Sequence, residues 1–302
     1  MTKNSSESTY IFDAERADEL ARLIQQGQAL TNAAGGTLSS IDTAVVEQCS
    51  TVLDLGCGPG DWALDVAFAH PTIEVTGVDI SKAMIDYAHA RATSQLLPNI
   101  SFQLMDITKP FDFADASFDL VNARFLVGVL YRDAWLPFLK ECTRILRPGG
   151  VLCLTEPIDL GLTSSLAYET LTGWMLQFYW KQGYSFSANG KSIGITHRLP
   201  YLLRLEGYEE VQQTGYAFDF STDMKSSWGL MRDNAVTGMK KACELFVHVG
   251  FATDEQVDGL YNQMMADLYG EDFSGVWHFA TIQGKKPLAA DQSSSGSGGG
   301  TK

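Results

Sequence analysis

The stretch that decides the fold is VLDLGCGPG, which runs from Val52 to Gly60. A short apolar run, typical of a buried strand, enters a Gly-rich turn here, and residues 61–69 that follow favour a helix. Glycines permit a tight bend and let a ligand approach the backbone closely. The first N–H groups of the following helix can receive polar or anionic groups. A purely structural turn would use the same glycines, so the surrounding sequence must decide between the two.

Outward from this turn, strand-like and helix-like segments alternate as far as residue 156. The segment Arg147-Pro148-Gly149-Gly150 ends the last helix of this series sharply. Strands separated by helices of this length predict βαβ units and a parallel sheet. The expected strands are 51–55, 74–79, 100–105, 118–122 and 151–155, and the expected helices are 61–69, 82–96 and 133–146.

The remaining segments predict a cap before this core and insertions after it. Residues 1–40 form a polar tail, a helix over 13–30 and a Gly-rich loop, and residues 41–288 form the domain itself. Residues 289–302 are a flexible Ser/Gly tail of the kind used as an artificial linker. Substrate-side insertions are expected near 157–195 and 224–273; helices are expected within 160–187 and at 196–206, 226–248 and 254–268, and strands at 210–220 and 276–283.

Two further aspartates follow predicted strands. Asp79 ends the second strand, about 20 residues after the glycines, where an acidic side chain can accept hydrogen bonds from ribose hydroxyls. Asp106 ends the third strand, where a carboxylate can accept from the amine of an adenine. The carboxyl ends of parallel strands share one edge of the sheet, and open α/β sheets bind ligands there. The set predicts a nucleoside site.

Composition excludes several classes of protein. The formal net charge is −14 with no basic run, so a nucleic-acid partner is not expected. The five cysteines contain no C-x-x-C pair, which predicts reduced thiols and neither a zinc site nor a disulfide framework. No signal peptide and no apolar run long enough for a membrane helix is seen. We therefore expect a cytoplasmic protein without a membrane or a bound metal, as a monomer or homodimer.

Five motifs in order resemble those of class I S-adenosylmethionine-dependent methyltransferases, with small-molecule enzymes as the nearest type. The resemblance covers about 100 residues, is highly specific, and implies a Rossmann-like, doubly wound α/β sheet of about seven mostly parallel strands, with an N-terminal cap helix and helical lid insertions. It implies S-adenosyl-L-methionine as cofactor and S-adenosyl-L-homocysteine as product. The motifs are VLDLGCGPG at 52–60, VTGVDIS at 75–81, FQLMDIT at 102–108, FDLVNARF at 118–125 and LRPGG at 146–150.

The resemblance also implies cofactor-binding roles for particular residues. The glycines and Cys57 would lie against the methionine end, Asp54 would hold the loop or reach the amino group through water, and Asn122 would offer its carbonyl to that group. Asp79 with Ile80 would bind the ribose and adenine, and Asp106 with Ile107 the adenine amine. Tyr10 and Arg22 would close over the carboxylate. The full set is Asp54, Gly56, Cys57, Gly58, Gly60, Asp79, Ile80, Asp106, Ile107, Asn122, Tyr10 and Arg22.

The acceptor is a small molecule by elimination and by composition. Asn122-Ala123-Arg124-Phe125 lacks the Pro-Pro motif of enzymes that methylate nucleic-acid amines. Residues 174–186 are rich in aromatic side chains, which suit a partly hydrophobic or aromatic substrate as well as a plain helix interior. The acceptor atom, O, N or C, stays open. His197 and Glu156 are the candidate catalytic bases.

Three rival interpretations remain. A non-catalytic cofactor-binding or scaffold protein would use the same loop. A short-chain dehydrogenase would require a Tyr-x-x-x-Lys pair, which this chain lacks, and its glycines would be spaced G-x-G-x-x-G, whereas position 61 is Asp. An aminopropyl transferase would carry paired acidic motifs that are not evident.

Overall fold

The computed structural model describes residues 17–288, and a single mixed sheet organises them. Its strand order is β3-β2-β1-β4-β5-β8-β6, with β7 also paired to β8. Strands β1 to β5 are mutually parallel, and β8 runs antiparallel to β5, β6 and β7. The strands are β1 Thr51–Leu55, β2 Glu74–Asp79, β3 Ile100–Leu104, β4 Phe118–Arg124, β5 Leu146–Pro157, β6 Leu162–Thr163, β7 Glu209–Asp219 and β8 Gly275–Lys285.

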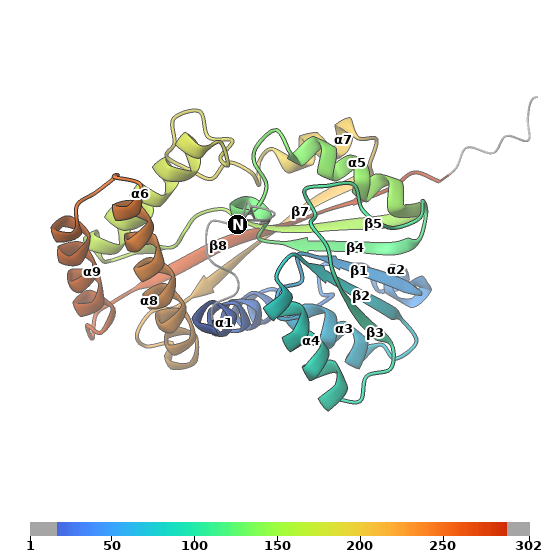
Figure 1. Ribbon diagram of the computed structural model, residues 1–302, viewed down its shortest axis with the longest axis horizontal. Helices are drawn as coiled ribbons and strands as arrows, with labels where there is room; N and C mark the ends of the chain where they lie inside the picture. Colours follow the sequence, from blue (N-terminus) through green and yellow to red (C-terminus); the bar gives the residue numbers. More distant parts are fainter. Residues whose placement is uncertain (1–16, 289–302) are drawn as a thin grey trace, which may run out of the picture.

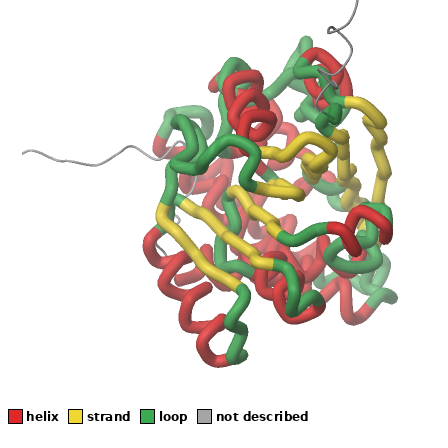
Figure 2. The backbone as a smooth tube through the Cα atoms, turned by 90° about the vertical axis from the view of Figure 1, so that its right-hand side faces the viewer, coloured by secondary structure: helices red, strands yellow, loops and turns green. Residues whose placement is uncertain are grey.

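Helices cover both faces of the sheet and the end at which the parallel strands finish (Figure 1). Helices α3 and α4 lie on one face and α5 and α7 on the other, while α6, α8 and α9 gather beyond the carboxyl ends of the strands. Figure 2 shows the strands of the twisted sheet enclosed by these helices. The helices are α1 Ala17–Ala33, α2 Thr43–Gln48, α3 Asp61–Ala69, α4 Lys82–Ser94, η1 Leu126–Gly128, α5 Trp135–Ile145, α6 Leu166–Gln182, α7 Leu199–Leu205, α8 Lys225–His248 and α9 Asp254–Leu268.

The prediction of a mostly parallel, doubly wound α/β sheet with helical insertions is confirmed. The sheet has one strand more than expected, because two residues of β6 pair with β8 next to the end of β5. The six-residue helix α2 was not predicted. Strand β5 begins at Leu146 and not at residue 151, since the backbone turns extended as soon as α5 ends. The Ser/Gly tail and the first part of the predicted cap helix lie outside the described residues.

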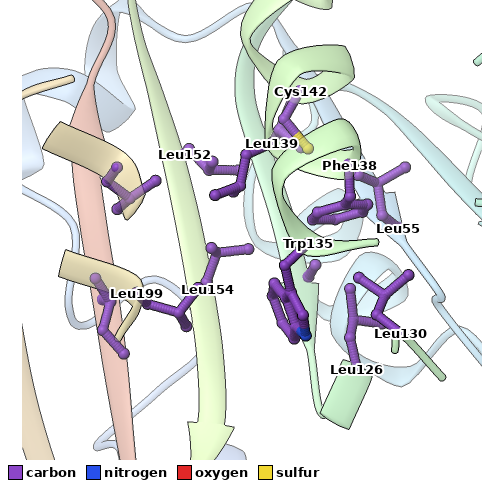
Figure 3. Close-up of a cluster of buried hydrophobic side chains, with 14 of the residues drawn as sticks. Leu55, Leu126, Leu130, Trp135, Phe138, Leu139, Cys142, Leu152, Leu154 and Leu199 are labelled. Atoms are coloured by element: carbon purple, nitrogen blue, oxygen red, sulfur yellow. The ribbon is translucent and has the colours of Figure 1, made fainter. Parts of the chain in front are cut away.

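The core between α5 and the sheet follows directly from the helical periodicity of α5. Trp135, Phe138, Leu139 and Cys142 share one face of the helix and are almost completely buried. Figure 3 shows them against leucines of β5 and of α7. Fully burying a side chain of this size contributes roughly 1.5–3 kcal/mol. This cluster fixes the sheet from which the site below is built.

The described chain bears on two expectations from the sequence, those about disulfides and about membrane-spanning helices. All five cysteines are free thiols, and four of them are buried. Within residues 17–288, no helix combines the length and the apolarity that crossing a bilayer would need.

Candidate functional site

A cavity of about 290 Å³ opens where the parallel strands end. Its floor, as we call it, consists of the cavity-lining residues within 54–61, 79–84, 105–108 and 124–129, which follow β1, β2, β3 and β4. Its roof consists of the cavity-lining residues of α1, α6 and α8, together with Pro157, Leu160 and Trp277. The floor therefore comes from the predicted nucleoside edge and the roof from the cap and the insertions.

The Gly-rich loop is held by the carboxylate of Asp79. Asp79 Oδ2 accepts from the N–H of Gly58 at 2.9 Å, and Oδ1 accepts from the N–H of Ser81 at 2.9 Å. Gly56 and Gly58 have φ of +68° and +53°, values that side-chain-bearing residues rarely adopt. Gly56, Cys57, Gly58 and Asp79 all line the cavity. The carboxylate thus fixes the loop and borders the cavity at the same time.

Gly60 does not line the cavity, in contrast to the prediction. Its φ is +82°, and a Cβ added there would lie 2.8 Å from Phe102 Cζ and 2.9 Å from Ala88 Cβ. The glycine is needed because the loop packs directly on β3 and α4. The observed role of Gly60 is close packing of the loop, and a contact with the cofactor stays a prediction.

Asp54 and Asn122 form a buried pair beneath the loop. Asn122 Nδ2 donates to Asp54 Oδ1 at 2.7 Å. Burial raises the pKa of Asp54 to about 6, against the opposing effects of Arg124 and Asn122. Asn122 itself does not line the cavity, because β4 continues past the predicted end at 122 to Arg124. Its side chain orients Asp54, and we do not retain its carbonyl as a cofactor contact.

At the far side of the floor, Asp106 lies beside two isoleucines. Its Oδ1 accepts from the Thr108 N–H at 3.0 Å and from the Thr108 hydroxyl at 2.6 Å, and its Oδ2 pairs with Lys109 Nζ at 3.0 Å. Partial burial opposes ionisation, but these bonds hold the pKa of Asp106 below its usual value. Ile80 and Ile107 line the cavity here. This end combines apolar walls with fixed carboxylates, which suits a nucleoside.

Arg22 lines the roof as predicted, but its guanidinium is already held. Nε and Nη2 donate to Glu19 at 2.9 and 2.6 Å, and Nη1 donates to Gln26 at 2.6 Å. Lys241 of α8 donates to the same Glu19 at 2.7 Å. Glu19 is fully buried, so this network ties α1 to α8. Tyr10, the other residue predicted to close over the carboxylate, lies outside the described residues.

Neither predicted base lies at the cavity. His197 is exposed in the segment before α7 and does not line the cavity. Glu156 is fully buried and does not line it either. Its carboxylate accepts from the N–H groups of Leu126 and Val127 at 2.7 and 3.2 Å, and burial raises its pKa to about 8. Glu156 shapes the loop after β4, and we retain neither residue as a base.

Sequence reasoning missed two charged residues and one aromatic contact. Asp61 and Arg124 both line the floor, and neither was predicted to bind. An arginine within a buried strand motif is the signal that could have identified Arg124, since arginine is seldom buried unless it has a partner. Phe125, at φ +59°, places its ring 5.2 Å from that of Trp277. No sequence signal predicts that contact, because the two residues lie about 150 positions apart.

The comparisons with known proteins agree with this geometry. Residues 52–150 match the family model described as "Methyltransferase domain". The methyltransferase pytC of Aspergillus terreus is 24% identical over 244 residues, which cover 78% of this chain and 71% of the relative. Demethylmenaquinone methyltransferases of Lactococcus lactis subsp. lactis and of Staphylococcus aureus are 36% identical over 106 residues and 37% identical over 111.

These last matches are partial, covering 34% and 36% of this chain and 41% and 44% of the relatives. Among solved structures, phosphoethanolamine N-methyltransferase 2 of Haemonchus contortus, in complex with S-adenosyl-L-methionine, superposes with a TM-score of 0.52. It is 16% identical, and the match covers 95% of this chain and 62% of that chain. At that identity the likeness concerns the fold.

Proposed function

We propose that this chain, a class I S-adenosylmethionine-dependent methyltransferase by its domain match and its relatives, methylates a small, partly hydrophobic or aromatic molecule. The single observation that carries the proposal is one cavity with two unlike sides. The carboxylates that line the cavity all lie on its floor, among glycines and apolar side chains, whereas apolar, aromatic and thioether side chains form most of its roof. A cofactor on the floor and an apolar substrate under the roof would meet within it.

The floor fits the cofactor by its own chemistry. Asp79 is half-buried at the end of β2, where it can accept from ribose hydroxyls, and Ile80 and Ile107 offer apolar faces to an adenine. At the other end, the buried Oδ2 of Asp61 has no hydrogen-bond partner in the described chain. An ammonium group would supply one. We propose Gly56, Cys57, Gly58, Asp79, Ile80, Asp106 and Ile107 as cofactor contacts, with Asp54 holding the loop.

The residues of this chain contribute orientation and exclusion of water. When bound, the sulfonium cofactor supplies a methyl group that is already activated for displacement. The floor would fix the donor, and Met175, Met239 and Trp277 would exclude water from the acceptor. Holding two reactants in line removes much of the entropic barrier of a bimolecular step.

The residues of the roof also limit which kind of acceptor group can be methylated. None of its described lining residues is a histidine, an aspartate or a glutamate. Burial raises the pKa of Tyr168 and of Tyr179 above that of free tyrosine, so neither phenol is a base near neutral pH. We therefore propose an acceptor whose own acidity provides the nucleophile, such as a phenol or an enol.

Calorimetric titration tests the first half of the proposal. We expect micromolar binding of S-adenosylmethionine and S-adenosylhomocysteine and no binding of NADH. Binding of NADH alone would overturn the assignment.

Transfer of a radiolabelled methyl group tests the second half. The probes are a set of phenols and hydroxyquinones, demethylmenaquinone, and phosphoethanolamine as a hydrophilic probe. Transfer to aromatic probes supports the proposal, and transfer to phosphoethanolamine alone contradicts the substrate class. Tight cofactor binding without transfer to any probe would favour a non-catalytic cofactor-binding protein.

A further inference from the structure

A charged gap lies where helix α1 passes over the Gly-rich loop. Asp61 begins α3, directly after the loop, and Arg124 ends β4. Both line the cavity, as does Gly27 of α1. A Cβ added to Gly27 would lie 3.7 Å from Asp61 Oδ2 and 3.8 Å from Arg124 Nη2. An acid and a base of opposite charge therefore border the same small space, which the glycine leaves open.

The acid side of the gap is incompletely satisfied. Asp61 Oδ1 pairs with Arg91 of α4, but Oδ2 is buried and has no hydrogen-bond partner within residues 17–288. An ionised oxygen buried without a donor is costly, and such groups commonly mark a ligand site. Asp61 lines the cavity, so a ligand bound there can supply the missing donor.

The basic side is incompletely satisfied as well. Arg124 Nη1 donates to the Thr31 hydroxyl at 3.3 Å, and the guanidinium forms no ion pair with the described carboxylates. Burial lowers the pKa of Arg124. The negative charges of three nearby carboxylates oppose this effect without forming an ion pair with the guanidinium: Asp54, Asp61 and Asp65. A guanidinium offers five donors in a planar fork, which matches a carboxylate. Most of these donors remain available to a ligand.

We propose that this gap recognises the amino-acid end of the cofactor as a zwitterion, with its ammonium on Asp61 and its carboxylate on Arg124. The inference rests on the proposed function. A simple anion would meet the repulsion of Asp61 and Asp54, and a simple cation that of Arg124. Only a ligand that carries both charges close together, as an α-amino acid does on one carbon, satisfies both sides. Arg22, which the sequence favoured for the carboxylate, is already engaged by Glu19 and Gln26.

Two nucleosides isolate this contact in a calorimetric experiment. S-adenosylhomocysteine carries the amino-acid end, and 5′-methylthioadenosine has the same adenosine without it. We expect Asp61→Asn and Arg124→Gln each to weaken S-adenosylhomocysteine about 10- to 100-fold, since each removes a charge-assisted hydrogen bond. Their affinity for 5′-methylthioadenosine should stay within about threefold of wild type.

A steric variant keeps the test open if a charge substitution impairs folding. Gly27→Ala fills the gap from α1 and should also weaken only S-adenosylhomocysteine. Gly173→Ala is its matched control, because a Cβ on that glycine of α6 would meet nothing within 4 Å. Its affinities should match those of wild type.

The outcomes separate the two proposals. Unchanged S-adenosylhomocysteine affinity in the folded variants, or equal loss for both nucleosides, overturns the zwitterion contact alone. If the wild-type protein binds neither nucleoside, the proposed function fails, and the contact fails with it. Selective loss of S-adenosylhomocysteine affinity supports both.

Discussion

The floor and the roof of the cavity are built on different principles. On the floor, carboxylates accept hydrogen bonds from residues close to them in the same loops, as Asp106 does from Thr108, or from an adjacent turn, as Asp79 does from Gly58. The roof is held by contacts between distant segments: Lys241 of α8 donates to Glu19 of α1, and Trp277 of the roof packs against Phe125 of the floor. The floor can therefore keep its shape while the roof changes, which suits an enzyme with one cofactor and a different substrate in each relative.

The largest expected effect comes from removing the charge of Glu19, the buried acid that joins α1 to α8. In Glu19→Gln, Arg22 and Lys241 lose the charge that they share, which should cost about 3–5 kcal/mol of unfolding free energy. Urea denaturation measures it. The exposed Glu47→Gln is the control and should stay within about 0.5 kcal/mol of wild type. A loss as small as that of the control would mean that the network does not hold the roof.

A substitution on the floor should act on binding more than on stability. Asp79→Ala removes the acceptor of two loop N–H groups and of the proposed ribose contact, so S-adenosylhomocysteine affinity should fall by about 2–4 kcal/mol. Calorimetry measures the affinity, and the exposed Asp112→Ala serves as control. Unchanged affinity in a folded Asp79→Ala protein would remove the ribose from this position.

The loop after β4 provides a pH-dependent test. Burial raises the pKa of Glu156 to about 8 from an ordinary value near 4.5. Between these two pH values the folded protein holds a proton that the unfolded chain releases, so folding stability falls as pH rises through this window. Glu156→Gln cannot titrate. Wild type should lose about 3–4 kcal/mol more than the variant between pH 5 and pH 8. Urea denaturation at each pH measures the free energy of unfolding. If this free energy changed with pH in the same way in wild type and in Glu156→Gln, the raised pKa of Glu156 would be contradicted.

The smallest expected effect is that of Tyr179→Phe, which tests whether any part of the cofactor contacts the roof. Tyr179 lines the roof, and Tyr179→Phe removes only its hydroxyl. S-adenosylhomocysteine affinity should stay within about twofold, because the proposed cofactor contacts lie on the floor and not under α6. Stability should change by less than about 1 kcal/mol. A tenfold loss of affinity would place part of the cofactor under α6.

The floor could be predicted because its determinants are local in sequence. The sequence marks each of them next to its own strand: the glycine turn follows β1, Asp79 ends β2 and Asp106 follows β3. The parallel sheet then brings them to one edge. Strand ends were less predictable. Because β4 extends to Arg124, Asn122 lies within the strand and does not line the cavity, whereas Arg124 does. Strand propensity alone does not identify this arginine as a functional residue.

The two candidate bases lie away from the cavity for reasons of tertiary packing. Glu156 lies near the end of β5, at the expected edge of the sheet, yet its two oxygens accept from the N–H groups of Leu126 and Val127 and it does not line the cavity. His197 is exposed in the segment that leads into α7 and does not line the cavity. Sequence gives the edge at which a side chain emerges, but only tertiary packing decides the direction in which it points.

The position of β8 has a consequence for how the molecule is made. Strand β8 lies inside the sheet, with β5 on one side and β7 on the other, and it carries Trp277 into the roof. Ribosomes deliver the chain from its N-terminus, so β1 to β5 emerge well before the strand that joins them to β7. Until residue 285 has been synthesised, β5 and β7 both expose unpaired backbone to the cell. The floor can form on the ribosome once β5 has emerged at residue 157, but the finished cavity must await β8, which begins only at residue 275.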